Sequence, residues 1–154
     1  MLKALELRIP PLVIVPLTAL GMWLVSSLGP SFSWPASARM LWSGVLGIAG
    51  LGVAFAGVRE FRVAKTTVNP MKPAEASRVV RSGIYRYTRN PMYLAVAMAL
   101  LAWAAHLGHA LAPCGVVLFV AWMNRFQIPP EERALAALFG DQFERYRGKV
   151  RRWI

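Results

Sequence analysis

Apolar residues along this chain fall into four runs separated by more polar segments. The runs cover residues 9–28, 40–58, 92–105 and 110–123. The first two are close to the length at which a helix, rising about 1.5 Å per residue, crosses a hydrocarbon core of about 30 Å. The last two are shorter and are joined by residues 106–109. We interpret them as a tight helical hairpin that crosses the bilayer with the help of flanking residues.

Beyond residue 123 the chain becomes amphipathic. Leu135, Leu138 and Phe139 recur at helical spacing, and Phe143 and Tyr146 continue the apolar stripe among arginines. Two short helices on the membrane surface explain this pattern. The sequence therefore predicts an all-α integral membrane protein with about four transmembrane helices, the last two a tight hairpin, followed by C-terminal cytoplasmic amphipathic helices.

The length of 154 residues fits a single membrane domain. We divide it into two N-terminal spans in residues 1–60, a cytoplasmic loop in 61–91, the helical hairpin in 92–123 and a cytoplasmic C-terminal cap in 124–154.

The charge distribution supports a membrane location and predicts an orientation. The chain is 56% hydrophobic and carries a formal net charge of +11. Arg39 is the one basic residue between the first two runs, and none lies between Tyr93 and Asn124. The positive-inside rule then places both termini and the 61–91 loop in the cytoplasm. We assign the positive charge to a membrane surface rather than to nucleic acid, and we expect a bacterial inner-membrane protein.

Neither a disulfide framework nor a metal site is expected. The single cysteine, Cys114, lies in an apolar run, which indicates a small buried hydrophobic residue. His106 and His109 lie at the turn of the hairpin, where interfacial polar residues are commoner than metal ligands. Lys3 and Arg8 precede the first run as in a signal peptide, but the length of that run favours a retained span.

Residues 82–93 form the densest group of candidate chemistry in the chain. Asn90 is a favoured N-cap and Pro91 a favoured first helical residue, so the third helix should begin at Pro91. The free amide groups at such an end can bind a carboxylate or a phosphate, and Arg86 and Arg89 would add charge-assisted hydrogen bonds. The alternative is a basic-aromatic membrane anchor, which accounts for the arginines and tyrosines but poorly for the Ser-Gly and Asn-Pro pairs.

A second polar group, Pro129-Pro130-Glu131-Glu132, follows the fourth run. We expect these residues to begin the next helix. Two interpretations of the glutamates remain open. They stabilise the helix end through its dipole, by about 0.3–1 kcal/mol each, or one of them lines a pocket and takes a hydroxyl, an amine or a proton.

Taken together, these segments resemble the isoprenylcysteine carboxyl methyltransferase family, whose wider group includes phospholipid N-methyltransferases. The resemblance extends over about residues 66–154. The matching segments are Val79-Val80-Arg81-Ser82-Gly83-Ile84-Tyr85, Arg89-Asn90-Pro91-Met92-Tyr93, and Glu131-Glu132-Arg133-Ala134-Leu135 through Phe139-Gly140.

The resemblance implies a membrane-embedded enzyme that uses S-adenosylmethionine without a Rossmann domain. The cofactor would lie at the cytoplasmic end of the hairpin beneath the C-terminal segment, and the acceptor would be a lipid-like or small hydrophobic molecule. Transferred position by position, with Arg89 added for its charge, the expected cofactor contacts are Arg78, Val79, Val80, Tyr85, Arg89, Asn90, Pro91, Tyr93 and Met98.

The candidate catalytic residues are Glu131, Glu132, Gln127 and Arg125. The two glutamates match the family pair and would face the cofactor and the acceptor. Carboxyl-methylating relatives carry an arginine near the position of Gln127, and Arg125, two residues away, would lie on another face of the helix. We therefore expect an amine, hydroxyl or thiol acceptor rather than prenylcysteine. Asn90 replaces a histidine of many relatives and cannot titrate.

Two other functions remain open on the sequence. Membrane sterol reductases have a similar C-terminal helical layout and use a nicotinamide cofactor, whereas a non-catalytic membrane scaffold would need only the anchor features. Cofactor binding distinguishes the methyltransferase, the reductase and the scaffold, because a reductase would prefer the dinucleotide and a scaffold would bind neither cofactor. The glycines of residues 40–58 permit close helix packing, either within the chain or in a dimer, so the oligomeric state stays open with the acceptor.

Overall fold

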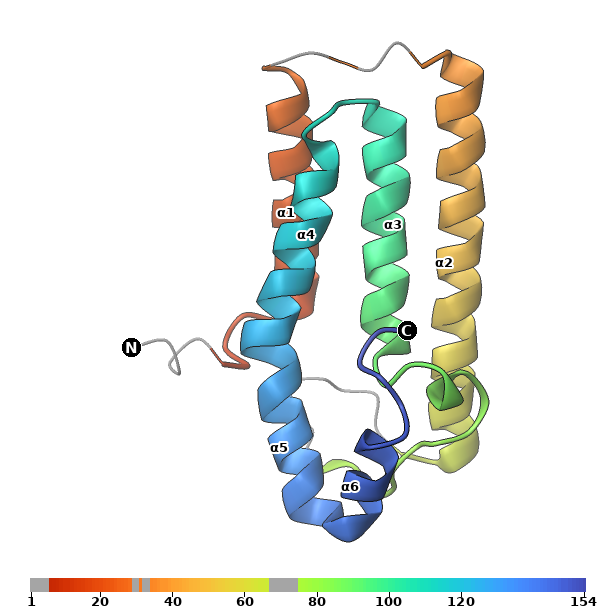
Figure 1. Ribbon diagram of the computed structural model, residues 1–154, viewed down its shortest axis with the longest axis vertical. Coiled ribbons are helices and arrows are strands. Elements are labelled where there is room, and N and C mark those ends of the chain that lie inside the picture. The colour runs from red at the N-terminus through yellow and green to blue at the C-terminus, as the bar shows by residue number, and fades with distance from the viewer. Residues whose placement is uncertain (1–5, 29–30, 32–33, 67–74) are drawn as a thin grey trace.

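The computed structural model describes residues 6–28, 31, 34–66 and 75–154 and shows an upright helical bundle with two further helices at one end (Figure 1). Within this part of the chain 74% of residues are helical and no strand occurs. The bundle consists of α1 (Pro11–Ser26), α2 (Ala36–Ala64), α3 (Pro91–Leu107) and α4 (Ala112–Trp122), and α5 (Ile128–Phe139) and α6 (Asp141–Arg147) follow.

Each of the four predicted spans contains a helix, but the lengths differ from those expected. In the described segments α2 alone is long and apolar enough to cross a membrane, because α1 and α3 are apolar helices of only 16 and 17 residues. The helix α2 has 29 residues and extends beyond the predicted run at both ends. Its last turns occupy the start of the predicted 61–91 loop, of which residues 67–74 lie outside the described part.

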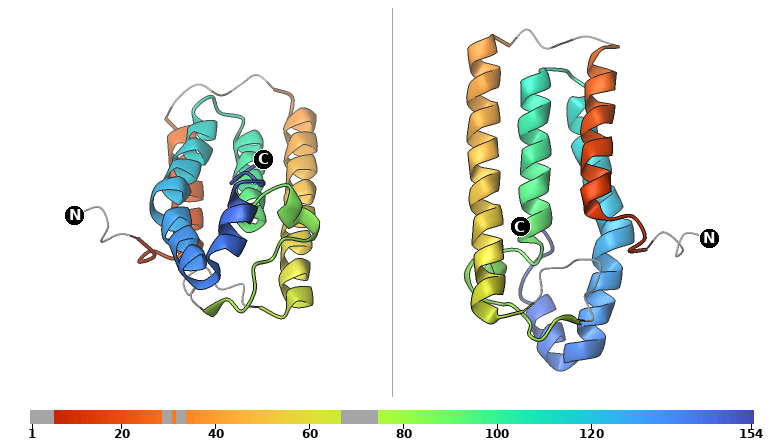
Figure 2. Two further views of the ribbon diagram at one scale, coloured as in Figure 1. Left: turned by 60° about the horizontal axis from the view of Figure 1, so that its bottom comes forward. Right: turned by 180° about the vertical axis from the view of Figure 1, so that it is seen from behind.

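The third and fourth runs form a helical hairpin, because α3 and α4 pack side by side around a turn at Gly108 (Figure 2). Two predictions near this turn are wrong. His109 is buried rather than interfacial, at 1% exposure, and its Nδ1 accepts a hydrogen bond from the Leu111 amide. Cys114 is exposed on the outer side of α4 rather than buried, because the bundle-facing positions of α4 include Ala112 and Val116 instead.

The expected helix at Pro129 is α5, which begins one residue earlier, at Ile128, and follows α4 without a break. A short π-helical turn, η4 (Met123–Gln127), joins them, with the amide of Ile128 bonded to the carbonyl of Met123. Pro129 and Pro130 lack amide hydrogens, so an α-helical ladder would leave two carbonyls of the preceding turn unbonded. The wider turn accommodates this loss. Glu131 lies in the first turn of α5, as expected, so the dipole interpretation and the pocket interpretation both stay open.

The centre of the bundle is α3, which contacts α1, α2 and α4. Gly50 and Gly57 of α2 face it. A Cβ atom at Gly50 would lie 3.2 Å from the Ala95 carbonyl oxygen, and one at Gly57 would lie 3.4 Å from the Pro91 side chain. These two glycines serve packing within the chain, as small residues do at close helix crossings.

The lower end of the bundle holds the predicted cap. The C-terminal segment forms two short helices, as predicted, and Gly140 separates α5 from α6. After α6 the chain turns back and ends beside the first turn of α3 (Figures 1 and 2). This return brings the C-terminal residues against residues 88–90, where the Arg89 amide donates to the Arg151 carbonyl.

Candidate active site

A cavity of about 500 Å³ opens at the lower end of the bundle. Its walls come from the first turns of α1, the end of α2, the segment 76–93, the start of α5 and α6. The volume lies within the range of small-molecule sites, and most of the lining is apolar with a few polar groups that converge. Elements far apart in the sequence meet here because α1 and α3 begin above α5, α6 and the last turns of α2 (Figure 1).

Most of the predicted site residues line this cavity. They are Arg78, Val79, Val80, Tyr85, Arg89, Asn90, Pro91, Tyr93, Glu131 and Glu132. Three predicted residues do not. Gln127 is buried beneath the cavity at 1% exposure, Arg125 is exposed with its guanidinium over the ring of Phe126, and Met98 lies against Gly50 of α2. Met98 and Arg125 are thus not brought to the site.

Glu131 is a half-buried acid that lines the cavity. Its Oε1 accepts hydrogen bonds from the hydroxyl of Tyr93 at 2.5 Å and from the amide Nε2 of Gln127 at 2.8 Å. Burial raises the pKa of the Glu131 carboxyl to about 7, although these two hydrogen bonds act to lower it. A carboxyl with this pKa exchanges a proton near neutral pH, which is what a general base or acid requires.

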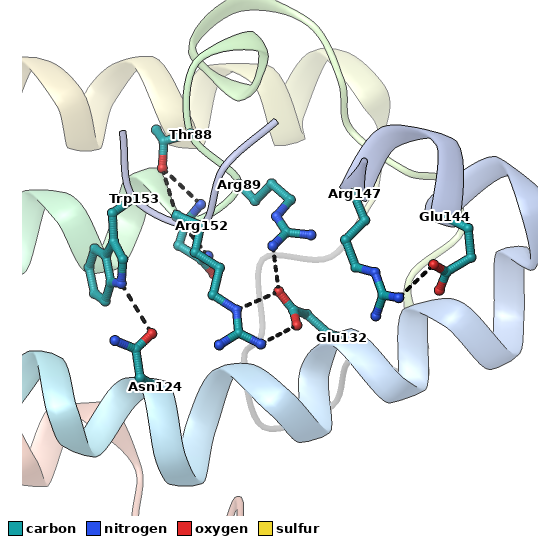
Figure 3. A network of polar contacts seen from close by, with 9 residues as sticks. Thr88, Arg89, Asn124, Glu132, Glu144, Arg147, Arg152 and Trp153 are labelled. Atoms are coloured by element: carbon teal, nitrogen blue, oxygen red, sulfur yellow. Dashed lines mark hydrogen bonds and ion pairs between the residues drawn. The ribbon is translucent and has the colours of Figure 1, made fainter. Parts of the chain in front are cut away.

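Glu132 lines the cavity, as predicted, and is also held by two arginines. Its carboxylate binds Arg89 at 3.0 Å and takes two hydrogen bonds from Arg152, from Nε at 3.0 Å and Nη2 at 2.7 Å (Figure 3). These bonds tie α5 to the segment before α3 and to the returning C-terminal chain. A carboxylate held by two guanidinium groups is a positioning group, so the two glutamates are not equivalent.

Arg89 keeps two donors directed away from its ion pair. Nη2 binds Glu132, whereas Nε and Nη1 are buried and have no hydrogen-bond partner within the described part. Burial lowers the pKa of the Arg89 guanidinium, which Glu132 partly offsets. Because Arg89 lines the cavity and unbonded buried donors are costly, these two N–H groups mark a place for an anionic oxygen.

Asn90 and Pro91 confirm the predicted start of α3, but not the predicted cap. Asn90 is the N-cap residue, yet its side chain makes no cap hydrogen bond. Its Nδ2 instead donates to the Arg152 carbonyl at 2.9 Å, and the hydroxyl of Thr88 donates to the same oxygen at 3.1 Å. Asn90 therefore fastens the returning C-terminal chain.

An aromatic wall completes the cavity, and of its members Tyr85 was predicted whereas Phe61, Phe143 and Tyr146 were not. Phe61 of α2 meets the ring of Tyr85 edge-on at a centroid distance of 5.3 Å, and Phe143 and Tyr146 come from α6. The Tyr146 hydroxyl donates to the Tyr85 carbonyl at 2.7 Å. Flat apolar rings of this kind suit a planar heteroaromatic ligand. The one sequence signal for these residues was the aromatic stripe of the C-terminal segment.

Glu60 is a buried acid that the sequence analysis missed. It lies at 7% exposure near the end of α2 and accepts a hydrogen bond from the Ser82 hydroxyl at 2.5 Å. Gly83 follows with φ of +54°, and a Cβ there would lie 2.5 Å from the Glu60 carboxyl carbon. The Ser-Gly pair is therefore needed to bring the segment of Tyr85 against α2.

Comparison with known proteins gives two matches. The model of the family described as phospholipid methyltransferase matches residues 38–142. An uncharacterized protein of Haemophilus influenzae is 49% identical over 63 residues, which are 41% of this chain and the whole of that protein. No solved structure matches. The matched range runs from α2 through the start of α6 and includes Glu131, the paired arginine and most of the cavity lining. This chain belongs to the phospholipid methyltransferase family.

Proposed function

We propose that this protein is a membrane-embedded enzyme that transfers a methyl group from S-adenosylmethionine to a lipid-like or small hydrophobic acceptor. The observation that carries the proposal is the convergence of Glu131 and Arg89 in one largely apolar cavity of about 500 Å³. The family match supports a methyltransferase of the membrane type.

The residues present fit S-adenosylmethionine. Its carboxylate matches the buried Nε and Nη1 donors of Arg89, which have no partner within the described chain. Its purine matches the wall formed by Tyr85 and Tyr146, whose rings line the cavity. When bound, this cofactor supplies a methyl group already activated by a sulfonium.

The part left to the protein is to hold, orient and deprotonate the acceptor. Tyr93 and Gln127 both donate to Oε1 of Glu131, so they fix the orientation of the carboxyl without engaging Oε2. In its ionised form Glu131 can take a proton from an amine, hydroxyl or thiol. A carboxylate acceptor would instead need a cation in its place, and Gln127 offers none. We therefore favour an acceptor that loses a proton.

The acceptor side of the cavity faces the lipid region in this proposal. Pro11, Leu12, Val15 and Pro16 of α1 line it and are apolar, and 87% of the Leu12 side chain is exposed. A hydrophobic chain can approach past these residues while its polar end meets Glu131. We place α1 to α4 in the bilayer and the cavity at its cytoplasmic edge, because Arg59 and Arg62 follow the apolar part of α2 there.

Titration calorimetry of S-adenosylmethionine and its demethylated product into the detergent-purified full chain tests this proposal. We expect Tyr85→Ala to weaken binding by about tenfold or more, because purine stacking on an aromatic ring contributes about 1–3 kcal/mol. Tyr85→Phe should retain the affinity, because the ring is kept.

Tyr87→Ala is the matched control, because Tyr87 is 74% exposed and does not line the cavity. It should change the affinity by less than about twofold, within the spread of neutral surface substitutions. Absence of binding to a monodisperse wild-type sample would contradict the proposal, and binding of a nicotinamide cofactor instead would favour a reductase.

A further inference from the structure

A second cavity of about 430 Å³, lined largely by basic residues, lies beside the first. Four cationic side chains surround it, two from the segment before and within η3 (Gly83–Arg86) and two from α6 and the turn after it. They are Arg81, Arg86, Arg145 and Lys149. We call these four residues the basic groove. Tyr146 forms a wall of both cavities, so the groove adjoins the candidate active site without being part of it.

Two acids near this end of the molecule, Glu144 and Glu132, are bound to other cations. Arg147 pairs with Glu144 at 2.8 Å, and Glu132 is shared by Arg89 and Arg152 (Figure 3). None of the ion pairs formed among the described residues includes a member of the basic groove. Four neighbouring positive charges from two chain segments repel one another. An anion bound between them would offset this repulsion.

The level of the groove points to the source of that anion. Residues 82–85 lie against the end of α2 through the hydrogen bond from Ser82 to Glu60 and the ring contact between Tyr85 and Phe61. Glu60 follows the apolar run 40–58 by two residues, which is about 3 Å along a helix. With α2 across the bilayer, as in the proposed function, the groove therefore lies where lipid phosphates lie. Lysines and arginines clustered at this level attract anionic headgroups.

We propose that the basic groove binds the phosphodiester headgroup of an anionic phospholipid at the cytoplasmic membrane surface. S-adenosylmethionine has no phosphate, so the cofactor of the proposed function does not account for these cations. The bound headgroup would hold α6 and the turn of Tyr85 together, since each contributes two members of the groove. The lipid bound here is distinct from the acceptor in the first cavity.

Binding of fluorescent phosphatidylglycerol to the full chain in a non-ionic detergent tests this proposal. The groove variant replaces its four members by glutamine. The control variant, Arg8→Gln/Arg62→Gln/Lys65→Gln/Arg125→Gln, removes the same charge from exposed positions elsewhere. We expect the groove variant to lose affinity by about thirtyfold or more, and the control to lose about threefold or less, because each nearby cation contributes separately.

Competition and cofactor titration complete the test. Unlabelled phosphatidylglycerol should displace the probe, whereas phosphatidylcholine and millimolar inorganic phosphate should not.

Equal losses in the two variants would overturn the proposal in favour of general surface charge, and displacement by inorganic phosphate would overturn the lipid source. The groove variant should bind S-adenosylmethionine like wild type, which separates this test from that of the proposed function. If the groove variant loses cofactor binding and also has a lowered Tm, it is misfolded. In that case the paired variants Arg81→Gln/Arg86→Gln and Arg145→Gln/Lys149→Gln are measured instead. At least one of these two must weaken lipid binding if the proposal holds.

Discussion

Glu131 gives the candidate active site its main chemical property, a proton that leaves near neutral pH. The carboxyl lies between α3 and α5, and burial raises its pKa from 4.5 to about 7. Between these two values the folded state holds a proton that the unfolded state has released. The stability contributed by this neutral carboxyl is therefore present at low pH and falls as the pH rises through this window.

The first prediction concerns Glu131→Gln, which keeps the shape of the side chain and removes the titration. As the pH rises from 5 to 8, the free energy of unfolding of the variant should increase relative to that of wild type by about 2–3 kcal/mol, the size expected from this pKa shift. This corresponds to a relative rise of about 5 °C or more in Tm. Thermal unfolding in detergent across this pH range measures it, and parallel curves for the two proteins would contradict it.

The second prediction uses Tyr93, whose hydrogen bond stabilises the ionised form of Glu131. Tyr93→Phe removes that bond and should move the folded-state pKa of Glu131 above 7. The window of stability loss should then extend to higher pH than in wild type. The same unfolding series reveals the shift, and the double variant with Glu131→Gln is the control, because it should show no such window.

At the scale of single elements, the turn at Ser82 and Gly83 fixes where the aromatic wall meets α2. Gly83 has a left-handed backbone and no room for a Cβ beside Glu60. By contrast, a Cβ added at Gly44 of α2 would meet nothing within 4 Å. The two glycines therefore differ in what they do, although both stand in segments that the sequence alone marks as functional or packed.

The third prediction follows from this difference. Gly83→Ala should lower the free energy of unfolding by roughly 1–3 kcal/mol, because strained backbone and the Glu60 contact combine. Gly44→Ala should be neutral or stabilising by up to about 1 kcal/mol, as for a glycine in an exposed helix position. Thermal unfolding of both variants measures the contrast. Equal Tm values for Gly83→Ala and wild type would show that the turn adapts without strain.

The sequence predicted the helical elements well and their junctions less well. Pro91 marked the start of α3 correctly, because a proline at the first helical position acts locally. Pro129 and Pro130 gave the same local signal, and α5 begins beside them at Ile128, but the π turn that joins α5 to α4 was not predicted. Whether a helix that starts at a proline stands alone or continues the preceding helix depends on the packing of both sides, which no local pattern contains.

At the scale of the whole molecule, the site residues that lie in local sequence patterns were predicted, and those that depend on long-range packing were not. Ten lining residues followed from two short segments whose pattern is specific. The lining residues from α1, with Phe61 and Phe143, escaped notice because they reach the cavity only when four helices and α6 assemble. Glu60 escaped for another reason, since an acid beside Arg59 at the end of a helix suggests a solvated pair. Its burial depends on the long-range contact with Ser82.

The returning C-terminal chain closes the assembly, and Arg152 is its main attachment. Its backbone carbonyl accepts hydrogen bonds from Thr88 and Asn90, and its guanidinium holds Glu132 of α5 (Figure 3). One residue thereby links the start of α3 with α5 at the edge of the cavity. The neighbouring Arg151 has an exposed side chain, and its carbonyl accepts from the Arg89 amide. The pair offers a matched comparison of two arginines in the same segment.

The last prediction compares Arg152→Ala with Arg151→Ala. Arg152→Ala removes two charge-assisted hydrogen bonds and leaves Glu132 to Arg89 alone, so Arg89 should be drawn further toward the carboxylate. We expect a fall in Tm of about 3 °C or more, since bonds at a partly exposed site contribute about 1 kcal/mol. We also expect S-adenosylmethionine to bind more weakly, because Arg89 is its proposed carboxylate partner. Arg151→Ala keeps every backbone bond and should change neither quantity. Equal behaviour of the two variants in unfolding and calorimetry would contradict a role for the C-terminal chain in shaping the site.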